Sequence, residues 1–196
     1  MRCSKEDAKN SILFAQLAAG KSNDRTKEAS VWLSTFIEML GKVGWVAASP
    51  KFTQVDDPAQ YGTVDKAVLS LLQNTLTAPQ LQLFDSTVQS FKENEIANKI
   101  FDSLSQSTNS SDAATFLTGV VNPTSDGDIA VTTSYFNYQT SAEITTTFFN
   151  SLTGAQVSLL QGNQTMILNS NIYGTVRDVV RHKLEAVGSE SYVVDL

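Results

Sequence analysis

Hydrophobic residues recur every three or four positions through the first half of the chain, which is the spacing of amphipathic helices. The pattern predicts about five helices within residues 1–105. The clearest is a broad apolar stripe over residues 29–43, and a third helix is predicted over residues 64–76. The front half is therefore expected to be a helical subregion.

Capping residues support the positions of these helices. Ser4 followed by Asp7, and Thr77 followed by Gln80, have the spacing of capping boxes at the starts of the first and fourth helices. Asp24 and Thr63 are the predicted caps of the second and third helices. The fifth helix is predicted from the apolar positions of residues 96–104.

The hydrophobic period shifts towards two after a polar stretch at residues 105–112, which is predicted to be a linker. The predicted strands cover residues 115–121, 129–138, 143–150, 156–160 and 165–168, with a hairpin tip at 161–164. Their links are too short for crossover helices, so the sheet is expected to be an antiparallel meander of four to five strands. A last helix, capped by Asn171 and ending at Gly188, and a short closing strand at 192–194 complete the prediction.

This order of elements predicts the α+β class: an N-terminal helical half packed on a C-terminal antiparallel meander, followed by one helix. A length of 196 residues fits a single domain, with a helical subregion at 1–105 and a strand-rich subregion at 112–196.

Charge is distributed very unevenly. No lysine or arginine occurs between Lys99 and Arg177, and the few charges in that segment are acidic. The whole chain has a net charge of −6 and only 17% charged residues. A segment without cations offers no permanent positive group for a phosphate backbone or an anionic head group. We therefore expect no nucleic-acid partner, and the absence of glycine-rich phosphate motifs disfavours nucleotides and other cofactors.

The ends of the chain carry no recognised targeting signal. The first residues become charged at once, without the apolar stretch of a secretory signal. No apolar run approaches the roughly 20 residues that span a bilayer. With Cys3 as the only cysteine, an internal disulfide is excluded. The sequence leaves the location open between the cytoplasm and release by a non-classical route.

Catalytic signals are weak. His182 is the only histidine, which excludes sites built on a histidine pair, and its spacing from Asp178 is typical of a surface ion pair on a helix. Cys3 could pair only with His182, from a terminus expected to be mobile. Arg177 and Arg181 share a helical face near a helix end, where the dipole favours cations.

Carboxylates provide the one enzymatic alternative. Residues Asp56 and Asp57, and residues Asp126 and Asp128, form two close pairs, and Glu143 lies in the strand-rich half. A small hydrolase with a carboxylate site requires several of these five side chains to converge in one pocket. Acidic residues in turns more often cap backbone amides, and Asp126 and Asp128 lack the spacing of a calcium-binding loop.

The uncharged strands carry the main functional hypothesis. The exposed edges of sheets often carry lysine, which prevents pairing with other chains, and residues 129–150 contain none. Three explanations remain open: helices cover the strands, the strands contact a partner or a second copy, or they form an amphipathic hairpin that enters a membrane. The preferred function is a non-enzymatic binding protein, toxin-like or an effector, that engages a protein, a glycan or a membrane surface. A structural, self-assembling protein is the second alternative. The candidate binding residues are Thr133, Tyr135, Tyr138, Thr146 and Phe148.

Overall fold

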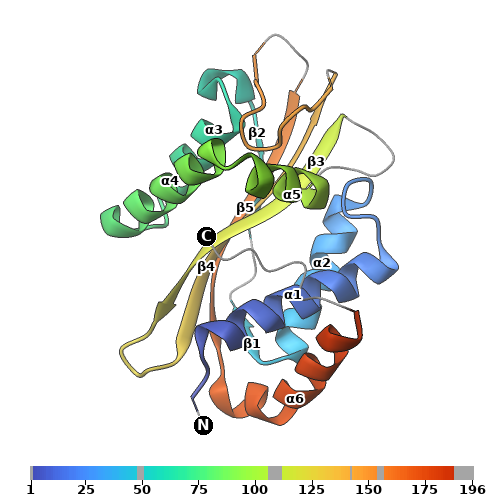
Figure 1. Ribbon diagram of the computed structural model, residues 1–196, viewed down its shortest axis with the longest axis vertical. Coiled ribbons are helices and arrows are strands. Elements are labelled where there is room, and N and C mark those ends of the chain that lie inside the picture. The colour runs from blue at the N-terminus through green and yellow to red at the C-terminus, as the bar shows by residue number, and fades with distance from the viewer. Residues whose placement is uncertain (1, 48–50, 106–111, 142, 154–156, 188–196) are drawn as a thin grey trace. The chain divides into compact units, whose positions relative to one another are not determined.

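In the computed structural model, helices dominate the first half of the chain and long antiparallel strands the second (Figure 1), which confirms the predicted α+β class. The structure describes residues 2–47, 51–105, 112–141, 143–153 and 157–187. Most of the predicted linker, residues 106–111, and the predicted closing strand at 192–194 lie outside these ranges.

The elements of the described ranges follow in chain order. The helices are α1 (Lys5–Ser22), α2 (Ala29–Lys42), a short 3-10 helix η1 (Pro58–Tyr61), α3 (Val64–Leu72), α4 (Ala78–Glu93), α5 (Glu95–Ser105) and α6 (Ser170–Val187). The strands are β1 (Trp45–Ala47), β2 (Lys51–Val55), β3 (Ala113–Pro123), β4 (Ile129–Thr140) and β5 (Val157–Leu168). The five predicted helices of the front half are all present.

Local capping explains where several helices begin. The Ser4–Asp7 capping box is present at α1, and the backbone N–H of Thr77 donates to the Gln80 side chain at α4. The cap of α6 is Asn169 rather than the predicted Asn171, because its side-chain oxygen accepts from the backbone N–H groups of Asn171 and Ile172, each at 3.1 Å. Asp24 caps the turn that precedes α2 rather than α2 itself.

The sheet has the strand order β1-β5-β4-β3, and β2 also pairs with β5. The predicted hairpin at residues 156–168 is wrong, because residues 157–168 form the single long strand β5. Gly162, the supposed turn residue, pairs with Phe52 of β2, so the backbone at this point is held in a ladder. The strand β2 was not predicted. It pairs with β5, and the paired positions run from Lys51 with Asn163 to Val55 with Leu159.

Residues 143–150 were predicted to be a strand and are not one. The backbone N–H of Asp65 donates to the carbonyl of Phe148 at 2.8 Å, and the N–H of Thr147 donates to the Asp102 side chain at 2.6 Å. The segment is therefore held by hydrogen bonds to α3 and α5 and is not paired as a strand. Its β-branched and aromatic residues pack into a core. Such residues favour buried packing, which a core provides as well as a sheet does.

The chain divides into two compact units, and each strand of the β3-β4-β5 meander contributes to both. Of the described residues, unit 1 comprises 2–47, 119–133 and 164–187, and unit 2 comprises 51–105, 112–118, 134–141, 143–153 and 157–163. Unit 1 therefore contains α1, α2, β1 and α6, whereas unit 2 contains β2, η1, α3, α4 and α5. A single domain over residues 1–196 stays a prediction.

The core of unit 2 is built from phenylalanine rings. Phe148 lies in its centre, with ring centroids 4.6 Å from Phe101 and 5.1 Å from Phe116. Phe116 stacks on Phe136 at 5.2 Å, and Phe91 of α4 contacts both Phe101 and Phe148. These distances lie in the favourable range for aromatic pairs. The cluster fixes α4 and α5 against β3 and β4.

The core of unit 1 joins α1, α2 and the ends of the strands. Trp32 and Phe36 stack along one face of α2, at 5.3 Å between ring centroids. The indole N–H of Trp45 donates to the Ser11 hydroxyl at 2.9 Å, which connects β1 to α1 through a fully buried serine. A buried indole N–H needs such a partner, so this bond helps to determine where α1 packs.

Candidate functional site

The five predicted binding residues do not form one exposed surface. Tyr135, Tyr138 and Phe148 are 3%, 0% and 4% exposed, whereas Thr133 and Thr146 are half-buried. Phe148 is the centre of the phenylalanine cluster described above. The prediction of a contact surface made by these three aromatic side chains is therefore corrected: they belong to the core, as the first of the three explanations expects.

Tyr138 shows why its side chain is structural. Its hydroxyl donates to the backbone carbonyl of Thr147 at 3.0 Å, which holds the irregular segment before Phe148 in place. Burial, together with the negative charge of Asp102, raises the pKa of Tyr138 far above its ordinary value. The phenol thus stays neutral and keeps its proton for this hydrogen bond.

An uncharged surface does exist in unit 1, on neighbouring positions of β1, β4 and β5. Val46 and Ile167 are cross-strand partners with 59% and 44% of their surface exposed. The hydroxyls of Thr132 and Thr165 lie 3.2 Å apart on adjacent strands. We call these four residues and the half-buried Ala130 the uncharged face.

Side chains alternate between the two faces of a strand, which explains why the residues predicted from the sequence differ from those of the uncharged face. Successive residues of a strand point to opposite faces, so Thr132 and Thr133 cannot lie on the same side. Thr133 instead lies against Gly119 of β3, where an added Cβ would be only 2.7 Å from the carbonyl oxygen of Thr132. A choice one residue away reverses the face, and no local signal distinguishes the two faces of such a uniformly uncharged strand.

A buried ion pair joins α1 and α6 within unit 1. The Arg177 guanidinium of α6 contacts both carboxylate oxygens of Asp7 in α1, at 2.9 and 3.1 Å. Both residues are buried, and the more exposed Arg181 approaches the same carboxylate at 3.5 Å. Burial alone would raise the pKa of Asp7. The N–H of Ser4 and the charge of Arg177 outweigh it, so the pKa is lowered.

The two remaining chemical candidates, Cys3 and His182, have different surroundings. The backbone N–H of Cys3 donates to the Ser170 hydroxyl at 3.2 Å, and that hydroxyl donates to Asp128 at 2.9 Å. Cys3 is thus buried and held, contrary to the expectation of a mobile terminus. His182 is exposed, and its Nδ1 lies 4.0 Å from the Glu185 carboxylate rather than beside Asp178.

The five acidic residues proposed for a hydrolase are divided between the units. Asp126 and Asp128 belong to the β3–β4 turn of unit 1, whereas Asp56, Asp57 and Glu143 belong to unit 2. Within the described ranges, no group of three or more histidine, cysteine or acidic side chains is arranged to hold a metal ion. This distribution gives no support to a shared carboxylate site.

The lowered pKa of Asp7 predicts a dependence of stability on pH. Because the folded carboxyl has a pKa below its ordinary value of 3.8, its stabilisation is complete above that pH. The stabilisation is lost as the pH falls through the folded pKa. Thermal unfolding between pH 7 and pH 2 should show a lower midpoint at acidic pH, and Asp7→Asn should flatten this dependence. An equal slope in both proteins would contradict the assignment to Asp7.

Comparisons with known proteins add little. No family model matches the sequence, and no curated protein matches it either. A solved structure of the Evf virulence factor aligns at a TM-score of 0.33 and 13% identity, over 93% of this chain and 74% of that one. This likeness is too low to carry an argument about function. Over the part of the chain described, no helix is both long and apolar enough to cross a bilayer.

Proposed function

We propose that this protein acts by binding rather than by chemistry, and that the uncharged face is the surface on which a second protein chain packs. The observation that carries the proposal is the exposure of the cross-strand pair Val46 and Ile167 beside the threonine pair Thr132 and Thr165. Exposed aliphatic side chains framed by hydroxyls are typical of the centre of a protein contact.

We infer that the partner is a second copy of the same chain, because the uncharged face lets two acidic molecules meet without placing like charges in contact. Each copy has a net charge of −6, so two copies repel one another unless acidic groups stay apart in the contact. The uncharged face meets that condition because none of its five residues ionises. Two such faces related by a two-fold axis would place aliphatic side chains and hydroxyls against one another. If the protein is instead an effector or toxin-like protein, the uncharged face would bind another target.

The proposal predicts a weak self-association that depends on the uncharged face. Sedimentation velocity over a concentration series should show a monomer–dimer equilibrium for the wild-type protein. Val46→Lys/Ile167→Lys should be monomeric, because it places desolvated charges in the contact. The substitutions make the net charge less negative, so greater repulsion between whole molecules cannot explain the loss. Flotation with neutral phosphatidylcholine vesicles is measured on the same samples.

A matched variant controls for the added charge. Val31→Lys/Val179→Lys changes two helix positions of unit 1 that are 53% and 55% exposed, and it should associate like the wild type. A wild-type protein that stays monomeric up to about 1 mM would contradict the proposal. If the wild-type protein floats with the vesicles and Val46→Lys/Ile167→Lys does not, the uncharged face binds a membrane instead.

A further inference from the structure

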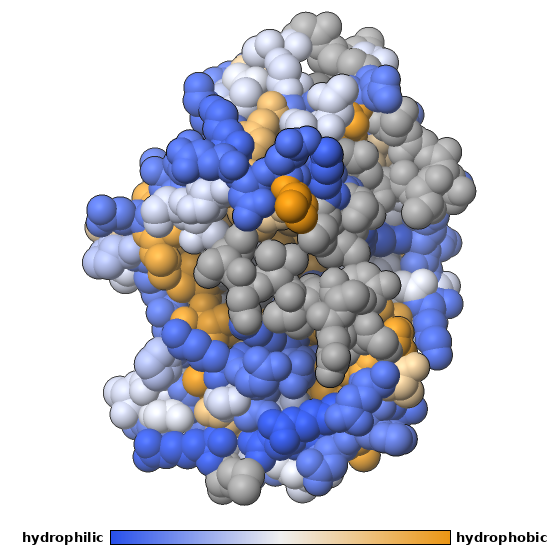
Figure 2. Space-filling model, viewed as in Figure 1, coloured by the Kyte–Doolittle hydropathy of each residue, from blue (hydrophilic) through white to orange (hydrophobic). Residues whose placement is uncertain are grey.

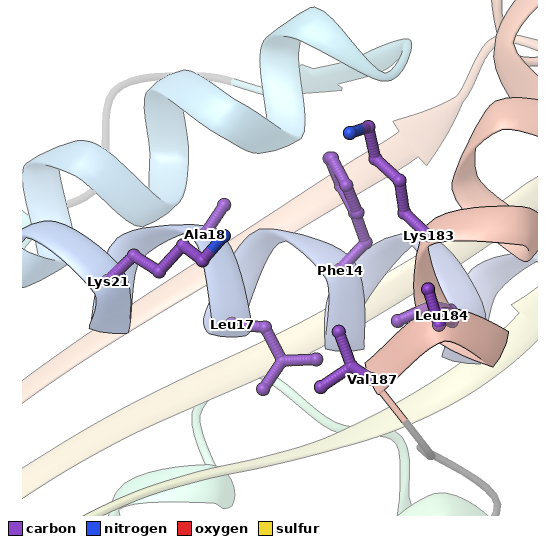
Figure 3. A pocket seen from close by; sticks show the side chains of 8 residues that line it. Phe14, Leu17, Ala18, Lys21, Lys183, Leu184 and Val187 are labelled. Carbon is purple, nitrogen blue, oxygen red and sulfur yellow. The ribbon is translucent and has the colours of Figure 1, made fainter.

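An apolar groove with two lysines lies between α1 and α6 of unit 1. Its volume is about 360 Å³, within the range of small-molecule sites. Figure 3 shows side chains from both helices around it. The apolar members are Phe14, Leu17, Ala18, Leu184, Ala186 and Val187, and the cations are Lys21 and Lys183.

The groove is held open by contacts elsewhere on the same two helices. The ion pair of Asp7 with Arg177 and Arg181 fixes the beginning of α1 against the middle of α6. Ala8, Ala15 and Ala19 are fully buried and pack α1 towards the core. Phe14, Leu17 and Ala18 therefore remain half-exposed along the side of α1, and the groove does not need a ligand in order to form.

The charges around the groove differ from those of the molecule as a whole. Lys21 and Lys183 are both exposed, and no acidic side chain lines the groove in the part of the chain that the structure describes. By contrast, Lys42 and Lys99 are each within 2.7 Å of a glutamate on their own helix. Hydrophilic side chains dominate the view of Figure 2, and separate apolar patches interrupt them. A small basic and apolar site on an acidic protein selects for a ligand with matching chemistry.

We propose that the groove binds a single-chain amphiphile with an anionic head group. The apolar side chains would contact the hydrocarbon chain, and the two ammonium groups would contact the head group at the rim. Lysine recognises charge without the fixed fork of arginine, so a carboxylate and a phosphate both satisfy this description. The proposal concerns α1 and α6 and does not depend on the uncharged face.

Titration calorimetry with dodecanoate, dodecyl phosphate and the uncharged dodecyl maltoside, below their micellar concentrations, tests the proposal. The two anionic probes should bind at one site, and the uncharged probe should bind at least tenfold more weakly. Lys21→Gln/Lys183→Gln should weaken the anionic probes about five- to tenfold, as expected for two exposed ion pairs. The ratio of the two anionic affinities distinguishes a carboxylate ligand from a phosphate ligand.

Two further variants make the result specific. Lys27→Gln/Lys66→Gln removes the same net charge from exposed lysines outside the groove and should bind like the wild type. Ala18→Trp places a large side chain in the groove and should abolish binding of all three probes. Equal affinity for the anionic and uncharged probes, or equal weakening by both glutamine pairs, would overturn the proposal. Absence of binding by the wild-type protein would overturn it as well.

Discussion

Replacing Asp7 by alanine is expected to lower the free energy of unfolding by about 3–5 kcal/mol, because it leaves the buried Arg177 guanidinium without its partner. Arg177 is only 7% exposed, so water cannot replace the carboxylate without rearrangement of α6. The substitution also removes the capping box of α1. Urea denaturation measured by circular dichroism gives the change directly.

Two comparisons separate the cost of the unpaired charge from the loss of a side chain. Glu38→Ala removes an exposed partner of Lys42 and should change the stability by less than about 0.5 kcal/mol. Asp7→Leu/Arg177→Met removes both buried charges and should be less destabilising than Asp7→Ala. A loss below about 1 kcal/mol in Asp7→Ala would show that the ion pair does not hold α1 and α6 together.

Replacing Phe148 by alanine is expected to cost about 3–5 kcal/mol, because the ring lies in the centre of the phenylalanine cluster of unit 2. The sequence had suggested that Phe148 contacts a partner. The two roles give opposite results in one experiment, since a core residue changes the denaturation midpoint and a contact residue changes only binding.

Thr146→Ala is the matched control for this prediction. Thr146 is half-buried, two residues before Phe148, and its truncation should change the stability by less than about 0.5 kcal/mol. A Phe148→Ala protein with wild-type stability would contradict the position of Phe148 in the core. Loss of self-association in that stable protein would return Phe148 to the binding surface.

The helices could be predicted because their signals are local. The apolar stripe of α2 and the capping boxes of α1 and α4 depend on residues less than one turn apart, or on one helical face. The strands were predicted less well, since Gly162 is typical of a turn in isolation, whereas in the structure it pairs with Phe52 of β2 inside the strand β5. Phe148 likewise looked like a strand residue because aromatic preference does not distinguish a sheet from a core.

The residues of the proposed contact surface are not the ones that the sequence suggested. The lack of cations suggested a surface on the strands of residues 129–150, whereas the uncharged face also includes Val46, which lies far outside that segment. The partner of Arg177 is Asp7, 170 residues earlier in the chain, whereas the sequence suggested the dipole of a helix end for this arginine. Pairings at this separation are determined by the fold, and one sequence contains no periodic signal for them.

Methyl-resolved NMR over a dilution series tests most directly whether the uncharged face is the contact surface. Val46 and Ile167 provide methyl groups within it, and Val31 and Val179 provide exposed methyl groups outside it. We expect the signals of Val46 and Ile167 to shift as the protein concentration rises, while those of Val31 and Val179 stay constant. Uniform signals at every concentration, or shifts confined to Val31 and Val179, would contradict the proposed function.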